Sequence, residues 1–419
     1  MFGPVAFGAV EPWSIFVMES GAVVLVLLWL AKQWIEEEVT VQWNPLFLPM
    51  AGFAVLVLAQ VVFRLSAYLH DTLSQAMLYA AYAMLAFLAC QSLTRSSQAR
   101  KLAVIFAVYG FLVAFLALLQ GIAPNGKLYW IRQPRIGGWI YGPYVNHNHY
   151  AGLMELLIPI LLVMSLTHLV HEKERTAAGI AAAVMTGTVF LSGSRGGMLA
   201  LTVEFVLFAI LVARQKRGPR FAAIVGVFAL ILVGMLAWLG GKELRGRISS
   251  ISKETRYEIS GGMRSNIDRD ALVMFRHKPV LGWGLGTFPV VYPQFRSFYT
   301  NFFVNEAHND YLQFLTETGL LGFAVVVWYL VLFYRTAFPK IGNWMSSVTS
   351  AVSLACVLAC TGILVHSLFD FNLQIPANAA IFYAFCAVGA SPPLLQRTRK
   401  RKPPAPDDAE NLVAASEAG

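Results

Sequence analysis

The chain is a succession of apolar segments, each about as long as the hydrocarbon core of a membrane is thick. A helix needs roughly 20 apolar residues to cross that core, and about eleven such segments can be counted. They are expected near residues 12–31, 45–63, 72–93, 101–121, 149–170, 177–194, 197–213, 221–240, 309–334, 349–369 and 376–392. Hydrophobic residues make up 57% of the chain and the mean hydropathy is +0.60, which excludes a water-soluble globule. The sequence therefore predicts an all-α, polytopic membrane protein with roughly 10 to 12 spans.

Longer polar stretches divide the chain into four parts. Residues 1–240 are expected to form a transmembrane bundle with an outer loop at 122–147, and residues 241–307 a large loop region containing short helices. Residues 308–392 return to the membrane, and residues 393–419 form a basic and then disordered tail. No cleavable signal peptide is expected, because the first residues lack a basic stretch.

The short loops indicate the orientation, because Lys and Arg gather on the cytoplasmic side. The basic residues of one set of loops are Arg95, Arg100, Lys101, Lys173, Arg175, Arg214, Lys216, Arg217, Arg220, Arg335, Lys340 and those at 397–402. With eleven spans, the N-terminus is then outside and the C-terminus inside, and the stretches 122–147 and 241–307 face the outer surface. The four cysteines all fall within predicted spans, so no disulfide framework is expected in the outer loops.

The outer loops carry cations that the topology rule does not explain, since long loops are exempt from it. Residues 122–147 contain Lys127, Arg132 and Arg135 without an acidic residue, and residues 241–307 contain ten Lys or Arg against six Asp or Glu. Most of these cations fit a solvated surface or contact with lipid headgroups. For a subset we favour a phosphate site, because the planar guanidinium of arginine can hold a diphosphate in a bidentate way without a metal.

Three arginines are candidates for that site. Arg195 lies in the small-residue break Leu191-Ser-Gly-Ser-Arg-Gly-Gly197, where glycines allow a ligand to approach the backbone; a tight helical hairpin with a snorkelling Arg is the alternative. Arg264 heads a short amphipathic helix, in which it could instead pair with Asp268 one turn later. Arg135 is the third candidate. The apolar side chains expected to pack together on that helix are Ile267, Ala271, Met274 and Phe275.

His308 lies where the chain re-enters the membrane, and a histidine there can act as a general base near neutral pH. Asn309 and Asp310, which follow it, are typical of a helix N-terminus. The alternative is a histidine that caps the helix or binds a headgroup. Glu306 or Asp310 could orient the imidazole, and the sequence leaves open which of them does.

Metal and nucleotide sites are not expected. The histidines of Asn146-His-Asn-His149 are two possible ligands without a neighbouring cluster, and the carboxylates of Asp268 and Asp270 diverge on a helix. The segment Gly282-Trp-Gly-Leu-Gly286 predicts a turn and not a dinucleotide fingerprint. No metal and no cofactor are therefore predicted.

Several motifs, taken together and in this order, resemble the O-antigen ligase and polymerase superfamily, from about residue 140 to 385. They are Val145-Asn-His-Asn-His149, Leu191-Ser-Gly-Ser-Arg-Gly196, Pro279-Val-Leu-Gly-Trp-Gly-Leu-Gly-Thr-Phe288, Ala307-His-Asn-Asp-Tyr-Leu-Gln313 with Glu317-Thr-Gly319, and His366-Ser-Leu-Phe-Asp370. The first 140 residues match only as generic spans. Family members often have about twelve spans with both termini inside, one more than is counted here.

The resemblance implies a helical glycosyltransferase of the C type that works without a metal on the periplasmic face of the bacterial inner membrane. Its donor would be a glycan on undecaprenyl diphosphate, and in a ligase the acceptor would be lipid A-core. Carried over residue by residue, Arg195 and Arg264 would bind the diphosphate and His308 would be the essential histidine. Glu306, Asn309, Asp310, Asn146 and Asn148 are expected to support the site.

Other functions remain open. A polymerase would use the same donor site with a second carrier-linked glycan as acceptor. A lipid-linked glycan flippase or transporter is the alternative of another class, because Glu155, Glu204 and Glu317 fall in or near spans. Such carboxylates also serve as hydrogen-bonding contacts between helices. Membrane lipids are expected partners and nucleic acid is not.

Overall fold

The computed structural model describes residues 1–134, 138–214, 261–301 and 303–395, together with residues 227, 230 and 234. Within these residues the regular structure is helical, with only isolated β-bridges besides, which confirms the predicted all-α fold. Outside the described residues lie Arg135, residues 241–260, the tail beyond residue 395, and the predicted span at 221–240 except for the three single positions.

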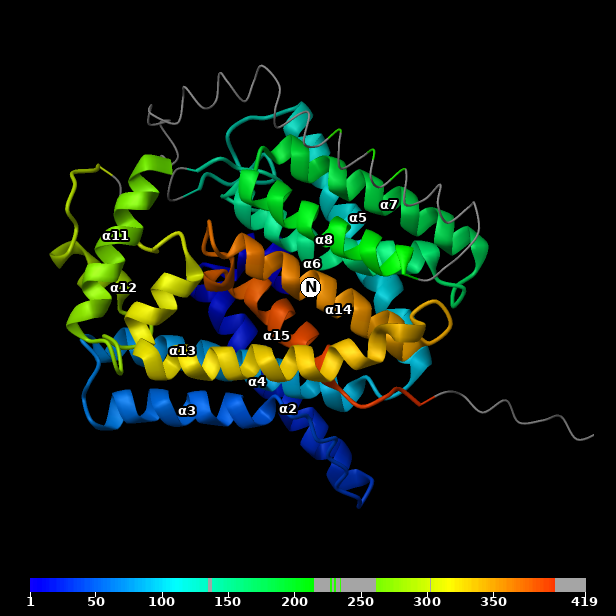
Figure 1. Cartoon of the computed structure of the whole chain (residues 1–419), viewed down its shortest axis with the longest axis horizontal. Helices are drawn as coiled ribbons and strands as arrows, with labels where there is room; N and C mark the ends of the chain where they lie inside the picture. The colour runs from blue at the N-terminus through cyan, green and yellow to red at the C-terminus, as the bar shows by residue number, and fades with distance from the viewer. Residues whose placement is uncertain are drawn as a thin grey trace, which may run out of the picture.

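The helices follow one another along the chain as separate rods with mostly short connections (Figure 1). Their bounds are α1 Phe2–Val5, η1 Phe7–Ala9, α2 Pro12–Ile35, α3 Phe47–Val62, α4 Leu69–Ser92, α5 Ser96–Ile122, α6 His147–Leu166, α7 Glu172–Ser192, α8 Arg195–Ala213, α11 Gly261–His277, α12 Phe288–Val291, η2 Tyr292–Gln294, α13 Asp310–Ala337, η3 Phe338–Asn343, α14 Val348–His366, η4 Asn372–Gln374 and α15 Pro376–Ala390.

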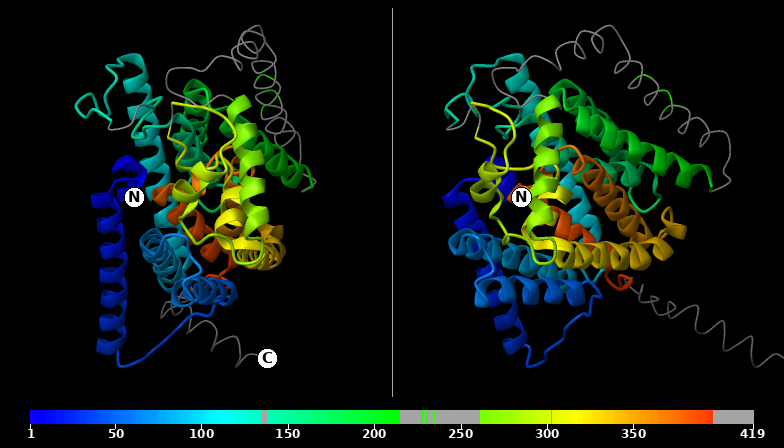
Figure 2. Two further views of the ribbon diagram at one scale, coloured as in Figure 1. Left: turned by 90° about the vertical axis from the view of Figure 1, so that its left-hand side faces the viewer. Right: turned by 60° about the vertical axis from the view of Figure 1, so that its left-hand side comes forward.

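Among the described residues, eight helices are long and apolar enough to cross a membrane. They are α2, α4, α5, α6, α7, α8, α13 continued by η3, and α14. The apolar helices α3 and α15 are shorter but coincide with two further predicted spans. Helix α2 runs along one edge of the bundle, and only 11% of its most apolar stretch is buried (Figure 2). We therefore expect most of α2 to face lipid.

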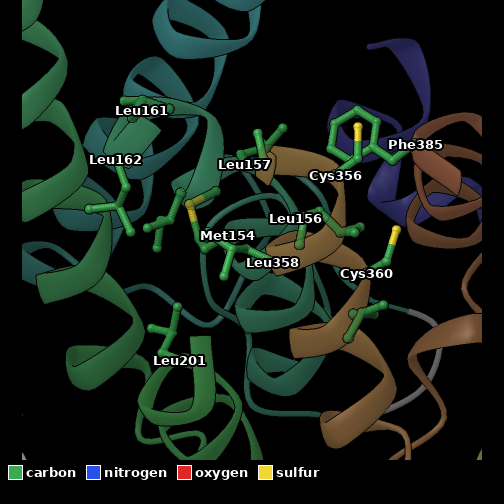
Figure 3. Close-up of a cluster of buried hydrophobic side chains, with 14 of the residues drawn as sticks. Met154, Leu156, Leu157, Leu161, Leu162, Leu201, Cys356, Leu358, Cys360 and Phe385 are labelled. Atoms are coloured by element: carbon green, nitrogen blue, oxygen red, sulfur yellow. The ribbon is translucent and has the colours of Figure 1, made fainter. Parts of the chain in front are cut away.

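Helix α6 forms the centre of the bundle, since 89% of its most apolar stretch is buried inside the protein. It contacts α7 and α14 extensively, and α5 and α8 as well. In Figure 3, Met154, Leu156 and Leu157 of α6 lie among Leu201 of α8 and Leu358 of α14. Close packing of this kind, rather than exclusion of water, holds helices together inside a membrane. The first turn of α6 is thereby fixed relative to its neighbours.

Helix α13 is broken at Gly319, whose φ of +65° and ψ of −167° belong to a region open essentially to glycine. A Cβ atom at this position would lie 2.4 Å from the carbonyl carbon and oxygen of Val280. The break is therefore a place where another segment approaches the helix backbone, and only glycine leaves room for it.

The segment that approaches is the glycine-rich turn at 279–286. The N–H of Trp283 donates to Thr316 O at 3.0 Å, and the N–H of Gly284 donates to Glu317 O at 2.9 Å. The side chain of Glu317 in return accepts hydrogen bonds from the N–H of Gly286 at 2.9 Å and of Phe288 at 3.2 Å. The turn thus supplies partners for backbone groups at the break, as a helix interrupted at membrane depth requires. The expected turn is confirmed.

Helices α11 and α12 stand together at one end of the bundle, where α13 begins (Figures 1 and 2). Ile267, Ala271 and Met274 of α11 are fully buried and pack in one cluster with Phe288 and Val291 of α12. Three of the four residues predicted for the apolar face of the helix are therefore confirmed, whereas Phe275 is only partly buried and lies outside this cluster. The cluster holds the first turn of α11 close to the start of α13.

Candidate functional site

The turn that follows α14 brings the candidate site together at this end of the bundle. Its centre is Asp370, whose side chain is only 1% exposed. The N-terminal residues of α6, the first turn of α11 and the segment before α13 all reach the carboxylate. Segments far apart in the sequence therefore meet around one acidic side chain.

Both oxygens of the Asp370 carboxylate have polar neighbours. The Nδ2 atom of Asn148 donates a hydrogen bond to Oδ2 at 2.6 Å, and Nη1 of Arg264 lies 3.6 Å from the same oxygen. Oδ1 lies 3.7 Å from Nδ1 of His308 and also 3.7 Å from Nε2 of His149. The carboxylate of Asp370 thus lies between His308, the candidate base, and Arg264, a candidate for binding phosphate.

These neighbours keep Asp370 ionised. Burial alone would raise the pKa of the carboxyl, but the charge of Arg264 and the imidazoles of His149 and His308 outweigh it. They hold the pKa of Asp370 well below its usual range. The site therefore contains a fixed negative charge directly behind His308.

His308 is held in an unusual backbone conformation. Its φ of +55° lies in the left-handed region, which few non-glycine residues adopt. Its ring stands edge-on to Phe371 with centroids 4.8 Å apart, and His149 contacts the same ring at 4.7 Å. The side chain of His308 remains 10% accessible. Strain of this kind concentrates at functional sites, where the surrounding structure must fix it.

Arg264 is positioned by the backbone as well as by Asp370. Its Nη1 donates to the carbonyl oxygen of Phe369 at 2.9 Å, and 21% of its side chain stays exposed. The positive charge of Arg264 also acts on Asp268, the alternative partner that the sequence predicted. Burial raises the pKa of Asp268 to about 6, and Arg264 opposes that rise. Arg264 is thus fixed on one side while remaining within reach of a ligand.

Arg195 is the first residue of α8, and it is exposed. Ser194 caps the helix by accepting a hydrogen bond from the N–H of Gly197 at 3.1 Å. Ser192 O, at the end of α7, lies 2.8 Å from Nδ1 of His147. The turn before Arg195 is therefore tied to the first turn of α6, which also carries Asn148. Arg195 and Arg264 are at the same end of the bundle.

The other predicted supporting residues have clear local partners. Asn309 and Asn146 cap α13 and α6, as their side chains accept hydrogen bonds from Tyr311 N at 3.1 Å and Asn148 N at 2.8 Å. The helix start predicted at Asn309 is therefore confirmed, and Asn146 is a further N-cap that the sequence analysis had not assigned.

Neither Glu306 nor Asp310 is directed at the imidazole of His308 in the described contacts. Asp310 accepts from Leu373 N at 3.0 Å, and Glu306 accepts from Nε2 of Gln313. Burial, together with nearby negative charge, raises the pKa of Glu306 to about 8. Among the described carboxylates, it is that of Asp370 that lies within 4 Å of a His308 nitrogen.

Asp270 on α11 has a structural role. Its buried side chain accepts hydrogen bonds from the hydroxyl of Tyr292 at 3.2 Å and from Ser297 N at 2.9 Å, and so connects α11 to residues 292–297. As for metal binding, no group of three or more His, Cys, Asp or Glu in the part of the chain that the structure describes could hold a metal ion.

An apolar cavity of about 360 Å³ opens between α3, α4, α13 and α15. Its wall includes Ala54, Ala76, Ala80, Phe314, Phe323 and Phe382. One end is polar, where Asp310, Tyr311 and Gln374 line it. Because Asp310 N donates to Ser367 O at 3.0 Å, this polar end adjoins the turn that carries Asp370. The cavity therefore extends from the space between these four helices to the neighbourhood of the candidate site.

Sequence reasoning did not assign roles to Asp370, His149 or Phe371. Asp370 closes the motif His366-Ser-Leu-Phe-Asp370, which supported the family resemblance but carried no function of its own. That motif was the sequence feature from which Asp370 could have been identified. The contact between Asp370 and His308 joins the turn after α14 to the segment before α13, and no local spacing rule predicts it.

A comparison with protein families supports the resemblance stated from the motifs. Residues 180–327 match the family model described as O-antigen ligase. The matched range runs from α7 into α13 and contains Arg195, Arg264 and His308, while Asp370 lies beyond it. The comparison with curated proteins found no match. Over the matched residues, this comparison confirms the resemblance of the polytopic helical protein to the O-antigen ligase and polymerase superfamily.

Proposed function

We propose that the protein is a membrane glycosyltransferase that transfers a glycan from undecaprenyl diphosphate to an acceptor hydroxyl on the periplasmic face. The observation that carries the proposal is Asp370, which lies beside both His308 and Arg264 at the polar end of the bundle. One site can therefore hold a base and a diphosphate ligand together. The family match supports the same class of enzyme.

Arg264 and Arg195 are proposed to bind the diphosphate of the donor. A lipid diphosphate leaves readily if its growing negative charge is held, and fixed guanidinium groups in a partly dry site do this better than water. Arg135, outside the described residues, is a third candidate. The apolar cavity would accept the first isoprene units of the carrier, since it begins at Asp310 beside the site. In this proposal the arginines take the place of a metal.

His308 is proposed to activate the acceptor. Asp370 faces Nδ1 and favours the tautomer with its proton there, which leaves Nε2 to take the proton of the acceptor hydroxyl. The hydroxyl oxygen then attacks the anomeric carbon as the bond to the diphosphate oxygen breaks, and the diphosphate departs with the bonding electrons. A single displacement of this kind inverts the anomeric centre. Catalytic hydrogen bonds often shorten when substrate binds, so a separation of 3.7 Å is compatible with this role.

The most suitable acceptor is lipid A-core, which would make the protein an O-antigen ligase. A polysaccharide polymerase is the second candidate, since a second carrier-linked glycan could use the same donor site. The distribution of Lys and Arg in the short loops supports a periplasmic site in the inner membrane.

Analysis of the glycan products of a deletion strain, by gel and mass spectrometry, separates these candidates. Accumulation of carrier-linked polymer that is not attached to lipid A-core is the expected result for a ligase. Accumulation of single repeat units would indicate a polymerase instead. Carrier-linked glycan trapped on the cytoplasmic face would overturn the proposal and favour a flippase.

A further inference from the structure

Besides Asp370 and His308, the bundle contains another close pair of ionisable side chains, Glu155 and His366, next to the candidate site. The Nδ1 atom of His366, near the end of α14, is 2.9 Å from Oε1 and 3.2 Å from Oε2 of Glu155 in α6. Glu155 is 0% exposed and His366 only 1%. Both are too deeply buried to meet an acceptor or a donor headgroup directly. The mechanism proposed above uses neither of them.

One side of this pair carries the turn of Arg195, which we define as residues 192–197. A Cβ atom at Gly196 would lie 2.6 Å from Cδ2 and 2.7 Å from Nε2 of His366. A Cβ atom at Gly197 would lie 3.0 Å from Oε1 of Glu155. The first turn of α8 therefore rests directly on both members of the pair, and its glycines allow this approach.

The other side of the pair carries the turn of Asp370, which we define as residues 367–371. The carbonyl oxygen of His366 accepts hydrogen bonds from Phe369 N at 2.9 Å and from Asp370 N at 3.1 Å. Phe369 O and the Asp370 side chain in turn contact Arg264. One histidine thus contacts the turn of Arg195 through its ring and the turn that holds Arg264 through its backbone.

We propose that Glu155 and His366 are positioning residues that set the turn of Arg195 against the turn of Asp370, and so fix the spacing of the two guanidinium groups. This inference rests on the proposed function, because the spacing matters only if both arginines bind one diphosphate. A buried pair is a poor source of stability, and holding a defined arrangement is a better reason to retain it. Small misplacements of binding groups are costly for transfer, with roughly 10²-fold lost per 1 Å.

Gly196→Ala tests the inference while leaving the pair itself intact. The new methyl group would lie 2.6 Å from Cδ2 of His366, so the contact between the turn of Arg195 and the His366 ring cannot persist unchanged. Gly187→Ala in α7 is the matched control, because a Cβ atom there would have nothing within 4 Å. Glu155→Ala removes the partner of His366, whereas Glu155→Gln keeps an oxygen that can accept from Nδ1–H. Rescue by glutamine but not by alanine is expected.

The first readout is a distance that does not depend on activity. Leu199 in α8 and Leu368 in the turn of Asp370 are 42% and 48% exposed, so cysteines placed there can carry spin labels. The four native cysteines are buried and should stay unlabelled. Gly196→Ala and Glu155→Ala should shift or broaden the distance distribution, while Gly187→Ala and Glu155→Gln should leave it unchanged.

The second readout is binding of farnesyl diphosphate to the full-length protein in nanodiscs. Gly196→Ala and Glu155→Ala should weaken it roughly tenfold or more, and the other two variants by less than about threefold. Unchanged distances in both Gly196→Ala and Glu155→Ala would overturn the inference. Shifted distances with wild-type affinity, in a protein whose Arg264→Ala variant has lost binding, would overturn it too. If Arg264→Ala binds as wild type does, the proposed donor site fails, and the distances alone decide whether the pair positions the two turns.

Discussion

The Oδ1 atom of Asp370 lies 3.7 Å from Nδ1 of His308, which places a buried carboxylate behind the candidate base. A carboxylate in this place selects the imidazole tautomer and stabilises the imidazolium that forms when the base takes a proton. Since Asp370 is also 3.6 Å from Arg264, the same charge helps to place the group proposed to bind the donor.

Asp370→Asn should therefore reduce kcat by roughly 10²-fold or more, because the amide keeps the shape of the side chain but removes the charge that supports His308. The measurement is transfer of a purified carrier-linked glycan under saturating donor. Asp268→Asn on α11 is the control and should change the rate by less than about threefold. An Asp370→Asn enzyme with near wild-type kcat would show that His308 does not depend on this carboxylate.

Arg264→Lys should bind donor almost as poorly as Arg264→Ala. The planar guanidinium carries several N–H donors, so it can donate to Phe369 O from Nη1 and also hold a diphosphate in a bidentate way, whereas an ammonium group cannot do both. Affinity for farnesyl diphosphate should fall roughly tenfold or more. Arg276→Lys, exposed on the same helix, is the matched control and should bind normally. Full rescue by lysine would leave only a point-charge role for Arg264.

Glu306 gives a prediction about pH and stability. Its pKa is raised from 4.5 to about 8, so its contribution to stability is fully present below pH 4.5 and is lost as the pH rises through 8. Glu306→Gln removes this loss. The difference in unfolding temperature between the variant and wild type should therefore increase in favour of the variant as the pH rises from 6 to 9, as measured by intrinsic fluorescence. A difference between variant and wild type that does not change with pH would contradict the raised pKa of Glu306.

Narrowing the apolar cavity should impair long-chain donors selectively. Ala80 lines the cavity from α4, and Ala80→Phe would fill space proposed for the carrier chain. We expect KM for a long-chain donor to rise roughly tenfold, about 1.4 kcal/mol, with little change for a short-chain donor. Met77→Phe is the control, since Met77 is 58% exposed on the same helix. Equal effects on both donors would place the chain elsewhere.

The spans were predictable because membrane thickness fixes the length of each apolar segment, whatever its neighbours. Even the short helices α3 and α15 were located by their composition. The cap at Asn309 was predictable for a similar reason. Its side chain accepts hydrogen bonds from backbone N–H groups only two and three residues away, so the whole interaction lies within one motif.

The contacts around Asp370 were not predictable in this way. An i, i+4 rule offered Asp268 as the partner of Arg264, whereas the structure places Nη1 of Arg264 3.6 Å from Asp370, over a hundred residues away. The contacts at the break in α13 could not be predicted from the sequence either. Gly319 could be seen in the sequence, but the turn at 279–286 that fills the break comes from another segment. Each depends on how helices pack, which periodicity does not encode.

The last prediction is that His308 activates the acceptor and does not bind the donor. His308→Ala should lower kcat by roughly 10² to 10⁴-fold while farnesyl diphosphate binds nearly as before. His308→Asn is the sharper variant, because asparagine tolerates the left-handed backbone at φ +55° but cannot serve as a base. Both variants should be equally inactive. If His308→Asn kept most of the rate, or if either variant lost donor binding as Arg264→Ala does, His308 would be a positioning residue, and the search for the base would move to Glu306 or His149.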